Sequence, residues 1–166
     1  AAQSVTAHAT RAYTGEDVQD ALARAFSNFG TARPRPAYLE VPLDLFTKPV
    51  GAGWKAQTIA TRPTASLQNI TSAVAMLKNA KRPFIILGGG ALDAGASAVK
   101  IAESIGAPIL TTTAGKGAVP ADHQNVWGYI LGHPDTQAAL QNSDCILAVG
   151  TELSETDFWA GSFRLN

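Results

Sequence analysis

Three consecutive glycines, Gly88, Gly89 and Gly90, follow the apolar run Phe84–Leu87 and precede a predicted helix. Glycine allows sharp backbone turns and close approach of a ligand, and a helix N-terminus offers free N–H groups to a phosphate. With the next glycine at Gly95, however, the spacing departs from the G-x-G-x-x-G fingerprint of dinucleotide-binding domains. The glycines therefore leave two interpretations open, a tight structural turn or a phosphate contact.

A second candidate site is the loop "TTTAGKG", which follows the apolar run before Thr112. Loops at the carboxyl ends of parallel strands commonly bind ligands in α/β sheets. Thr112, Thr113, Gly115 and Lys116 are the candidate residues, with Lys116 able to meet a phosphate or a partner domain. The alternative is an ordinary solvated lysine in an exposed loop.

The segment "GTELSETDFW" also follows an apolar strand and begins at Gly150 and Thr151. Its carboxylates, Glu152, Glu155 and Asp157, could bind a cation, but their spacing matches no defined calcium loop. A solvated loop that forms an interface is the alternative, and self-association through the Trp159 loop would follow from it. The histidines are scattered and predict no zinc site, and no hydrolase elbow motif occurs.

Composition excludes several classes of function. The 166-residue chain has a formal net charge of zero and 16% charged residues, so no basic field attracts nucleic acid or an anionic membrane. No apolar stretch approaches the ~20 residues of a membrane span. The single cysteine, Cys145, lies in an apolar run where a buried, reduced thiol is expected, which favours a cytoplasmic setting.

Apolar periodicity predicts the elements that carry these loops. Thr14 is expected to cap a helix with Asp17 in a capping box, with an apolar face over 18–29 and Gly30 closing the helix; a strand follows over 37–41. No period occurs from 47 to 63, which predicts a linker whose one large residue, Trp54, packs on a neighbouring surface or mediates self-association.

From Ser66 onward, helices and strands alternate. Ser66 is expected to cap a helix, and strands are predicted over 84–87, 109–112 and 145–150. Helices are predicted over 94–105, closed by Gly106, and over 135–141, with His133 near its start. Short apolar strands separated by helices are typical of an α/β fold with a parallel sheet flanked by helices on both faces.

Several ordered segments together resemble thiamine-diphosphate-dependent enzymes of the acetolactate synthase, benzoylformate decarboxylase and pyruvate oxidase group. Within the group, "GTELSETDFW" is similar to decarboxylases of guanidino-2-oxo acids. The segments that carry the resemblance are "RPAYLEVPLDLF", "AKRPFIILGGGA", "IGAPILTTTAGKGAVPADH", "WGYILG" and "SDCILAVGTEL".

The resemblance implies three domain assignments. Residues 1–46 would be the end of a pyrimidine-binding domain, 47–65 a linker, and 66–166 a Rossmann-like central domain that lacks its final strand or strands. Thiamine diphosphate and Mg²⁺ would bind the full-length parent outside this chain, since the family's activating glutamate would lie before Ala1 and its Gly-Asp-Gly motif after Asn166. The parent would be a 2-oxo acid decarboxylase or synthase and a homodimer or homotetramer, and this chain alone would be inactive.

Flavin-containing relatives bring FAD close to the positions that match the three candidate loops, from Gly88, Thr112 and Gly150 onward. Those relatives carry an arginine-containing run where this chain has acidic residues after Thr151. Arginine is the side chain suited to a diphosphate, so FAD is not expected and the site residues would be a remnant of a nucleotide site. Two alternatives are a stand-alone module that binds FAD, NAD or ADP and a purely structural interaction domain.

Overall fold

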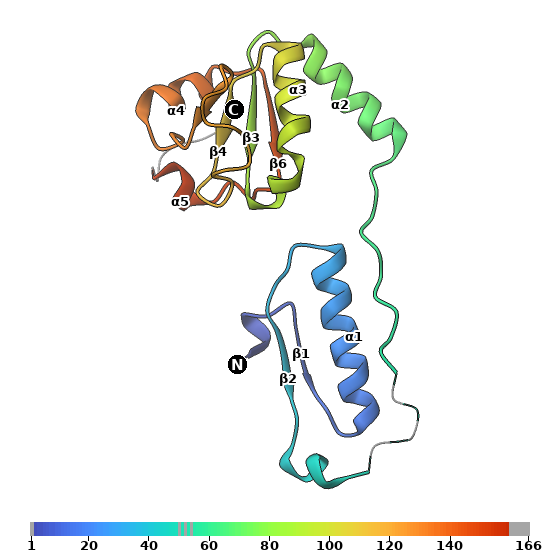
Figure 1. Cartoon of the computed structure of the whole chain (residues 1–166). Helices are drawn as coiled ribbons and strands as arrows, with labels where there is room; N and C mark the ends of the chain where they lie inside the picture. The colour runs from blue at the N-terminus through green and yellow to red at the C-terminus, as the bar shows by residue number, and fades with distance from the viewer. Residues whose placement is uncertain (1, 50, 52, 54, 160–166) are drawn as a thin grey trace. The chain divides into compact units, whose positions relative to one another are not determined.

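The structure is a computed structural model that describes residues 2–49, 51, 53 and 55–159. The chain divides into two compact units, residues 1–65 and residues 66–166 (Figure 1). Trp54, for which packing on a neighbouring surface was predicted, lies outside the described residues. None of the helices in the described part of the chain has the length and apolar character needed to cross a membrane.

The first unit is a parallel β-α-β arrangement. Strands β1 (His8–Arg11) and β2 (Ala37–Glu40) pair in parallel and are joined by helix α1 (Gly15–Thr31). The predicted capping box is confirmed, because Thr14 accepts from the N–H of Asp17 and the Asp17 side chain accepts from the N–H of Thr14. Short 3-10 helices flank this unit at Ala2–Ser4 and Leu43–Thr47.

The end of α1 differs from the prediction. Gly30 does not close the helix in the left-handed conformation; α1 continues to Thr31, and Ala32 ends it with extended backbone. Glycine can adopt the helical conformation within a helix, as Gly30 does here. The space beside Gly30 is taken by Ala60 and Ile59. A segment of the predicted linker therefore packs beside Gly30 at ordinary van der Waals distance.

The described residues of the predicted linker include a stretch bound to α1. The Gln19 side chain donates to the carbonyl of Lys55, and Gln57 Nε2 donates to Asp20 Oδ1 at 2.6 Å. The N–H of Ala60 donates to Ser27 Oγ at 3.4 Å. Within the first unit, residues 55–60 therefore lie along the helix even though they have no apolar period.

The second unit alternates helices and strands as predicted. Its elements are α2 (Leu67–Asn79), β3 (Pro83–Leu87), α3 (Gly95–Ile105), β4 (Ile109–Thr111), β5 (Val126–Gly128), α4 (Pro134–Gln141), β6 (Cys145–Val149) and α5 (Glu155–Phe158). Ser66 caps α2 by accepting from the N–H of Asn69, and Gly106 ends α3 with φ of +67°. A 3-10 helix, Gly89–Ala94, joins β3 to α3, so the regular helix begins one residue later than predicted.

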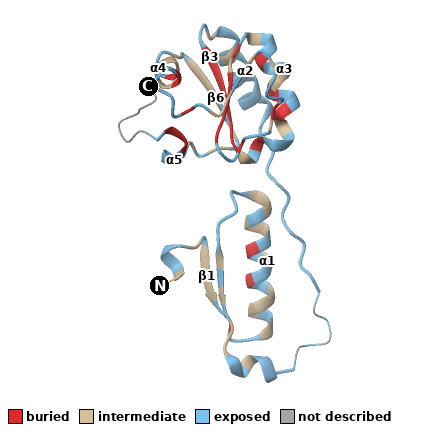
Figure 2. Cartoon of the chain, turned by 60° about the vertical axis from the view of Figure 1, so that its left-hand side comes forward, coloured by how far each residue is buried: buried red, intermediate tan, exposed pale blue. Residues whose placement is uncertain are grey.

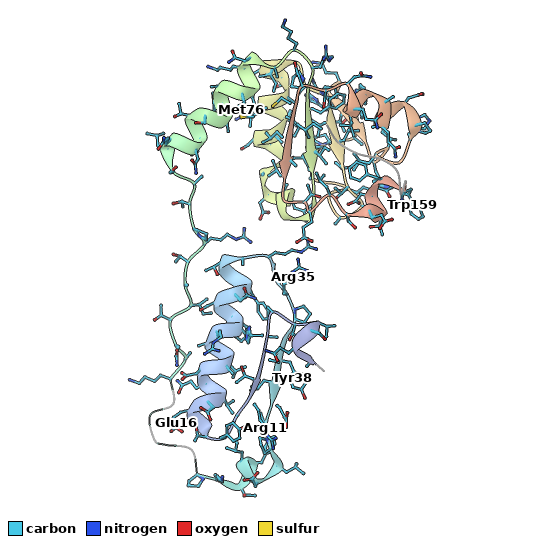
Figure 3. All side chains as sticks on the ribbon, turned by 180° about the vertical axis from the view of Figure 1, so that it is seen from behind. Arg11, Glu16, Arg35, Tyr38, Met76 and Trp159 are labelled. Carbon is cyan, nitrogen blue, oxygen red and sulfur yellow. The ribbon has the colours of Figure 1, made fainter. Side chains whose placement is uncertain are left out.

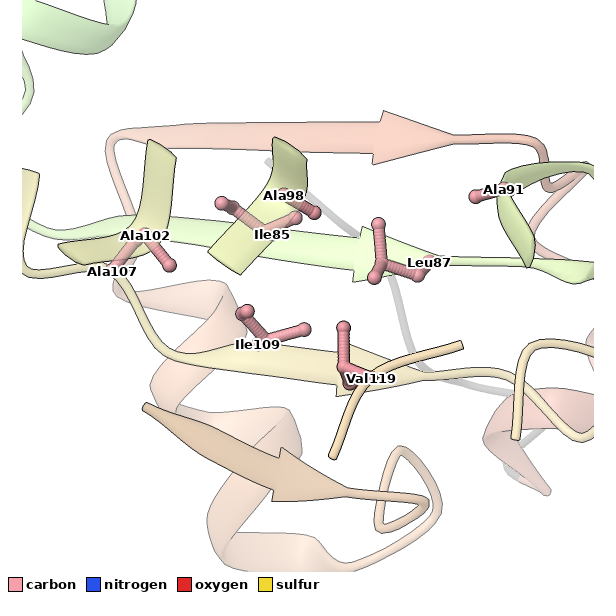
Figure 4. Close-up of a cluster of buried hydrophobic side chains, with 8 residues drawn as sticks. All are labelled: Ile85, Leu87, Ala91, Ala98, Ala102, Ala107, Ile109 and Val119. Carbon is pink, nitrogen blue, oxygen red and sulfur yellow. The ribbon is translucent and has the colours of Figure 1, made fainter. Parts of the chain in front are cut away.

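The four strands form one parallel sheet in the order β5-β4-β3-β6, which confirms the predicted fold class. Helix α3 covers one face, where Ile85, Leu87 and Ile109 pack against Ala98 and Ala102 (Figure 4). Helices α4 and α5 cover the other face, where Phe84, Ile86 and Leu110 pack with Leu131, Leu140 and Phe158. The sheet is a doubly covered parallel layer with both faces apolar.

Several features of the second unit differ from the sequence-based expectation. Helix α2 has no buried residue (Figure 2). Cys145 is only partly buried, because β6 lies at the edge of the sheet. Two short strands, β1 in the first unit and β5 in the second, were not predicted, since neither "HATR" nor "VWG" shows a clear alternation.

Candidate functional site

The candidate glycines gather at the carboxyl ends of β3, β4 and β6, where their backbones touch directly. A Cβ atom built on Gly88 would lie 2.3 Å from the carbonyl oxygen of Gly150 and 2.6 Å from Cβ of Thr151. A Cβ on Gly150, whose φ is +62°, would lie 2.4 Å from the backbone nitrogen of Ala91. The loops after β3 and β6 therefore pack without intervening side chains.

The loop after β4 joins the same packing. A Cβ on Gly115 would lie 2.1 Å from the carbonyl oxygen of Leu87, which also accepts a 2.9 Å hydrogen bond from the N–H of Thr112. The N–H of Gly115 donates to both the carbonyl and the hydroxyl of Thr112, each at 3.1 Å. Thr112 is buried, so its hydroxyl organises this turn and does not face a ligand.

Backbone donors that could cradle a phosphate are used inside the protein. The N–H of Gly88 donates to Val149 at 2.9 Å, that of Gly90 to Gly150 at 3.0 Å, and that of Ala91 to Gly88 at 3.0 Å. A phosphate-binding turn needs free N–H groups and open space above the glycines. The space over Gly88 and Gly90 is filled by the β6 loop, so these residues fit a tight structural turn better than a nucleotide.

A polar cluster lies beside this turn, next to α5. Asp157, only 7% exposed, accepts from the backbone N–H of Thr113 at 3.1 Å and from its hydroxyl at 3.3 Å. The Trp159 indole N–H donates to the Tyr129 hydroxyl at 3.3 Å. The hydrogen bond with the Thr113 side chain, and then the one from Trp159, lower the pKa of Tyr129. Burial and the charge of Asp157 oppose this lowering, and Lys116 adds to it.

This cluster brings together residues from two of the predicted segments. Thr113 and Lys116 come from the loop after β4, and Asp157 from the acidic segment, whereas Glu152 and Glu155 are exposed. The hydroxyl of Thr151 is occupied by the N–H of Leu153 at 2.9 Å. Tyr129 is not among the predicted site residues, although it lies in the segment "WGYILG" that carries part of the family resemblance.

The buried carboxylate of Asp157 has a structural role. It joins the β4 loop to α5, while Phe158, the next residue, packs in the core beneath α4. Over the described ranges, no group of three or more His, Cys, Asp or Glu side chains could hold a metal ion. His133 caps α4 by accepting from the N–H of Asp135, which places it near a helix start as predicted.

Comparisons with known proteins agree with this architecture. Residues 70–164 match the family model described as "Thiamine pyrophosphate enzyme, central domain". A Pseudomonas aeruginosa protein described as "Probable 2-ketoarginine decarboxylase" is 37% identical over 158 residues, covering 93% of this chain and 28% of that protein. The acetolactate synthase large subunit of Corynebacterium glutamicum is 31% identical over 159 residues, covering 91% of this chain and 25% of that protein.

A comparison of folds gives a solved structure with a similar fold. A solved structure described as a thiamin diphosphate-dependent enzyme from Mycobacterium smegmatis superposes with a TM-score of 0.72 at 21% identity, over 86% of this chain and 28% of that chain. The chain thus spans about a quarter of the length of the relatives it matches.

Proposed function

Since this chain belongs to the thiamine pyrophosphate enzymes and contains their central domain, we propose that it is the scaffolding part of a larger enzyme that breaks or forms the C–C bond beside the carbonyl of a 2-oxo acid. The family match over residues 70–164 carries this proposal. The parallel sheet and its internally packed glycine turns support a structural role for the domain.

The catalytic groups are proposed to lie elsewhere in the parent polypeptide. Thiamine diphosphate, when bound, supplies the chemistry of the bond next to the carbonyl, and Mg²⁺ would hold its diphosphate. The sequence contains no Gly-Asp-Gly, and no metal-binding cluster occurs among the described residues. This chain would therefore position domains and subunits without touching the reacting atoms.

For the substrate, we propose a guanidino-2-oxo acid such as 2-ketoarginine. The support is the relative described as a 2-ketoarginine decarboxylase, which is 37% identical to this chain, against 31% for the acetolactate synthase large subunit. The acidic segment after β6 shows the same resemblance in the sequence.

The test compares this chain with its full gene product. Each is mixed with thiamine diphosphate and Mg²⁺, and release of CO₂ is followed with 2-ketoarginine or pyruvate. We expect turnover only from the full gene product, and faster with 2-ketoarginine. Turnover by the 166-residue chain would overturn the scaffold assignment, and exclusive formation of acetolactate from pyruvate would overturn the substrate.

We propose the following organisation and setting for the parent protein. The 47–65 segment and residues 1–46 are proposed as the linker and the end of a pyrimidine-binding domain, because they precede the matched central domain in a separate compact unit. A homodimer or homotetramer is proposed because half-exposed apolar residues on α1, among them Phe26 and Phe29, leave a surface for other parts of the assembly. A single, unpaired cysteine fits a cytoplasmic protein.

The alternative of a stand-alone nucleotide-binding module is not favoured. The loops that would hold the phosphates, beginning at Gly88, Thr112 and Gly150, pack against one another. Calorimetry with ADP, NAD and FAD tests this directly, and micromolar binding of any of them by the 166-residue chain would restore the alternative.

A further inference from the structure

Residues 55–60, called the strap below, are held on α1 by side chains of the helix. At one end of the strap the Gln19 side chain donates to the carbonyl of Lys55. At the other end Ser27 Oγ accepts from the N–H of Ala60 at 3.4 Å. A third hydrogen bond, 2.6 Å long, joins the middle of the strap to the helix. The strap is therefore attached to α1 along its whole length.

The strap has little slack between these contacts. The helix rises by about 12 Å from Gln19 to Ser27 and by about 16 Å from Gln19 to Gly30, and Ala60 lies beside both Ser27 and Gly30. The five peptide units from Lys55 to Ala60 span at most about 16–18 Å. A nearly extended segment cannot shift along the helix by one residue without losing its partners, so we expect the strap to leave α1 as one piece.

The contacts that hold the strap are few and lie at the surface. Every residue of the strap is exposed, and Ile59, its one large apolar side chain, is 46% exposed. Among the residues that the structure describes, no hydrogen bond joins the backbone of the strap to another backbone group. Segments with few buried apolar contacts open at free energies far below that of global unfolding. The strap should therefore leave α1 while the first unit stays folded.

The rest of the first unit is held together without the strap. Figure 3, in which Glu16 marks the first turn of α1, shows the strap on the side of the helix away from β1 and β2. The pairing of β1 with β2 involves no residue of the strap, and neither does the capping box of Thr14. Release of the strap would thus leave the β-α-β arrangement intact.

The strap also contains a peptide bond that reports on its release. Trypsin cleaves after lysine and arginine but cuts poorly before proline, and between residues 25 and 77 only the bond after Lys55 is a basic site without a following proline. The other basic residues of that range, each followed by proline, are Arg33, Arg35, Lys48 and Arg62. A serine protease must hold the carbonyl of the cleaved bond in its oxyanion hole, and the carbonyl of Lys55 accepts from Gln19. Cleavage there requires that this contact be broken.

We propose that residues 55–60 form a releasable strap, which shortens the free connection between the two units while it is bound to α1 and leaves the helix as one piece. With the strap bound, residues 61–65 connect it to the N-cap of α2 at Ser66. Release adds the six residues of the strap to this connection, up to about 20 Å of chain. The inference goes beyond the proposed function and does not depend on the substrate or the cofactor.

Limited digestion of the full gene product with trypsin tests the proposal. Mass spectrometry follows the fragment that begins at Ala56, and a synthetic peptide of residues 51–62 gives the rate for the free segment. The native protein should be cut after Lys55 at least ten-fold more slowly than the peptide. Gln19→Ala leaves the sequence around the cut unchanged and favours the helix, so the three- to ten-fold faster cleavage that we expect, about the effect of one hydrogen bond, would report release.

Two further variants separate release of the whole strap from other effects. Ser27→Ala removes the contact at the far end of the strap and should speed cleavage after Lys55 by about two-fold or more. Arg24→Ala is the matched control, because Arg24 is exposed on α1 and makes no hydrogen bond to the strap in the part of the chain that the structure describes. Its rate of cleavage after Lys55 should equal that of the native protein.

Each other outcome counts against the proposal. Cleavage of the native protein at the rate of the peptide would show that the strap is not bound to α1. Equal rates in the Gln19→Ala and Arg24→Ala variants would show that the contact with Lys55 does not hold it. Acceleration by Gln19→Ala without acceleration by Ser27→Ala would reveal a local contact and no strap that leaves as one piece. Acceleration accompanied by cleavage after Arg24, which lies within α1, would assign the effect to unfolding of the helix.

Discussion

Replacing Gly88 by alanine tests whether the glycine turn is a packing device. The backbone of Gly88, with φ of −102° and ψ of −175°, is one that alanine adopts readily, so any cost comes from the added methyl group. That methyl would lie 2.3 Å from the carbonyl oxygen of Gly150, more than 1 Å inside ordinary contact at 3.4 Å. Overpacking typically costs about 1–3 kcal/mol, and the obstacle here is backbone that cannot rotate away.

We therefore expect Gly88→Ala to lower the free energy of unfolding of the second unit by about 3 kcal/mol or more. For a domain of this size, the midpoint of thermal unfolding would fall by about 12 °C or more. Urea and thermal unfolding followed by far-UV circular dichroism measure the two quantities. Loss of the cooperative transition would be the extreme form of the same result.

Two matched variants separate the possible causes. A methyl on Gly89 would lie 3.1 Å from Cβ of Ala114 and 3.3 Å from its carbonyl oxygen, about 1 Å farther than the contact at Gly88, so Gly89→Ala should cost about 1 kcal/mol. Gly106→Ala meets no atom within 4 Å but has φ of +67°, so it reports backbone strain alone, about 1–2 kcal/mol. If Gly88→Ala destabilises no more than Gly89→Ala, the packing argument is wrong. If Gly88→Ala leaves the free energy of unfolding unchanged and abolishes nucleotide binding, the turn is a ligand site.

Three further perturbations address other features of the chain. Asp157→Ala leaves two donors of Thr113 without their acceptor and should lower the free energy of unfolding, measured by urea titration, by about 1–3 kcal/mol. Thr113→Val removes only the hydroxyl and should lower it by less. Equal losses of stability in the two variants would contradict this ranking. The backbone N–H groups of Lys81, 2.8 Å away, and of Arg82 donate to Asp144 and lower the pKa of its carboxyl group. The contribution of Asp144 to stability is therefore present above the unfolded value of 3.8 and is lost as the pH falls through the lowered pKa. Asp144→Asn should flatten the acid side of the stability profile, and an unchanged profile would refute the assignment. Thr14→Ala removes the cap of α1 and should cost about 1 kcal/mol, whereas Thr14→Ser should be nearly neutral by circular dichroism; equal stability of the two variants would show that the cap contributes nothing.

The local chemistry of the chain predicts much of the fold. Thr14 and Ser66 cap their helices as expected, and Gly106 ends α3 in the left-handed conformation. The apolar runs before Gly88, Thr112 and Gly150 become adjacent parallel strands. These features depend on neighbouring residues and on the period of apolar residues, which a single sequence displays directly. The family resemblance is confirmed by the comparisons.

Features that depend on distant contacts were not predictable in the same way. Gly30 remains helical, and the residues that pack beside it lie about thirty positions later in the chain, a contact that the sequence does not display. Cys145 is half-buried only because its strand lies at the edge of the sheet. The contact between Gly88 and Gly150 joins loops more than sixty residues apart, and a run of glycines does not distinguish such a contact from a phosphate cradle. The roles of Gly88–Gly90, Thr112 and Gly150 as a nucleotide-site remnant stay a prediction.

The direct backbone contact between the loops after β3 and β6 also has a mechanical consequence. Side chains can change rotamer and absorb a displacement, but two main chains in van der Waals contact transmit it almost undiminished. We therefore expect the two loops to move as one rigid unit that comprises Gly88–Ala91 and Gly150–Thr151. A displacement of α5 would then be transmitted to the 3-10 helix that follows β3.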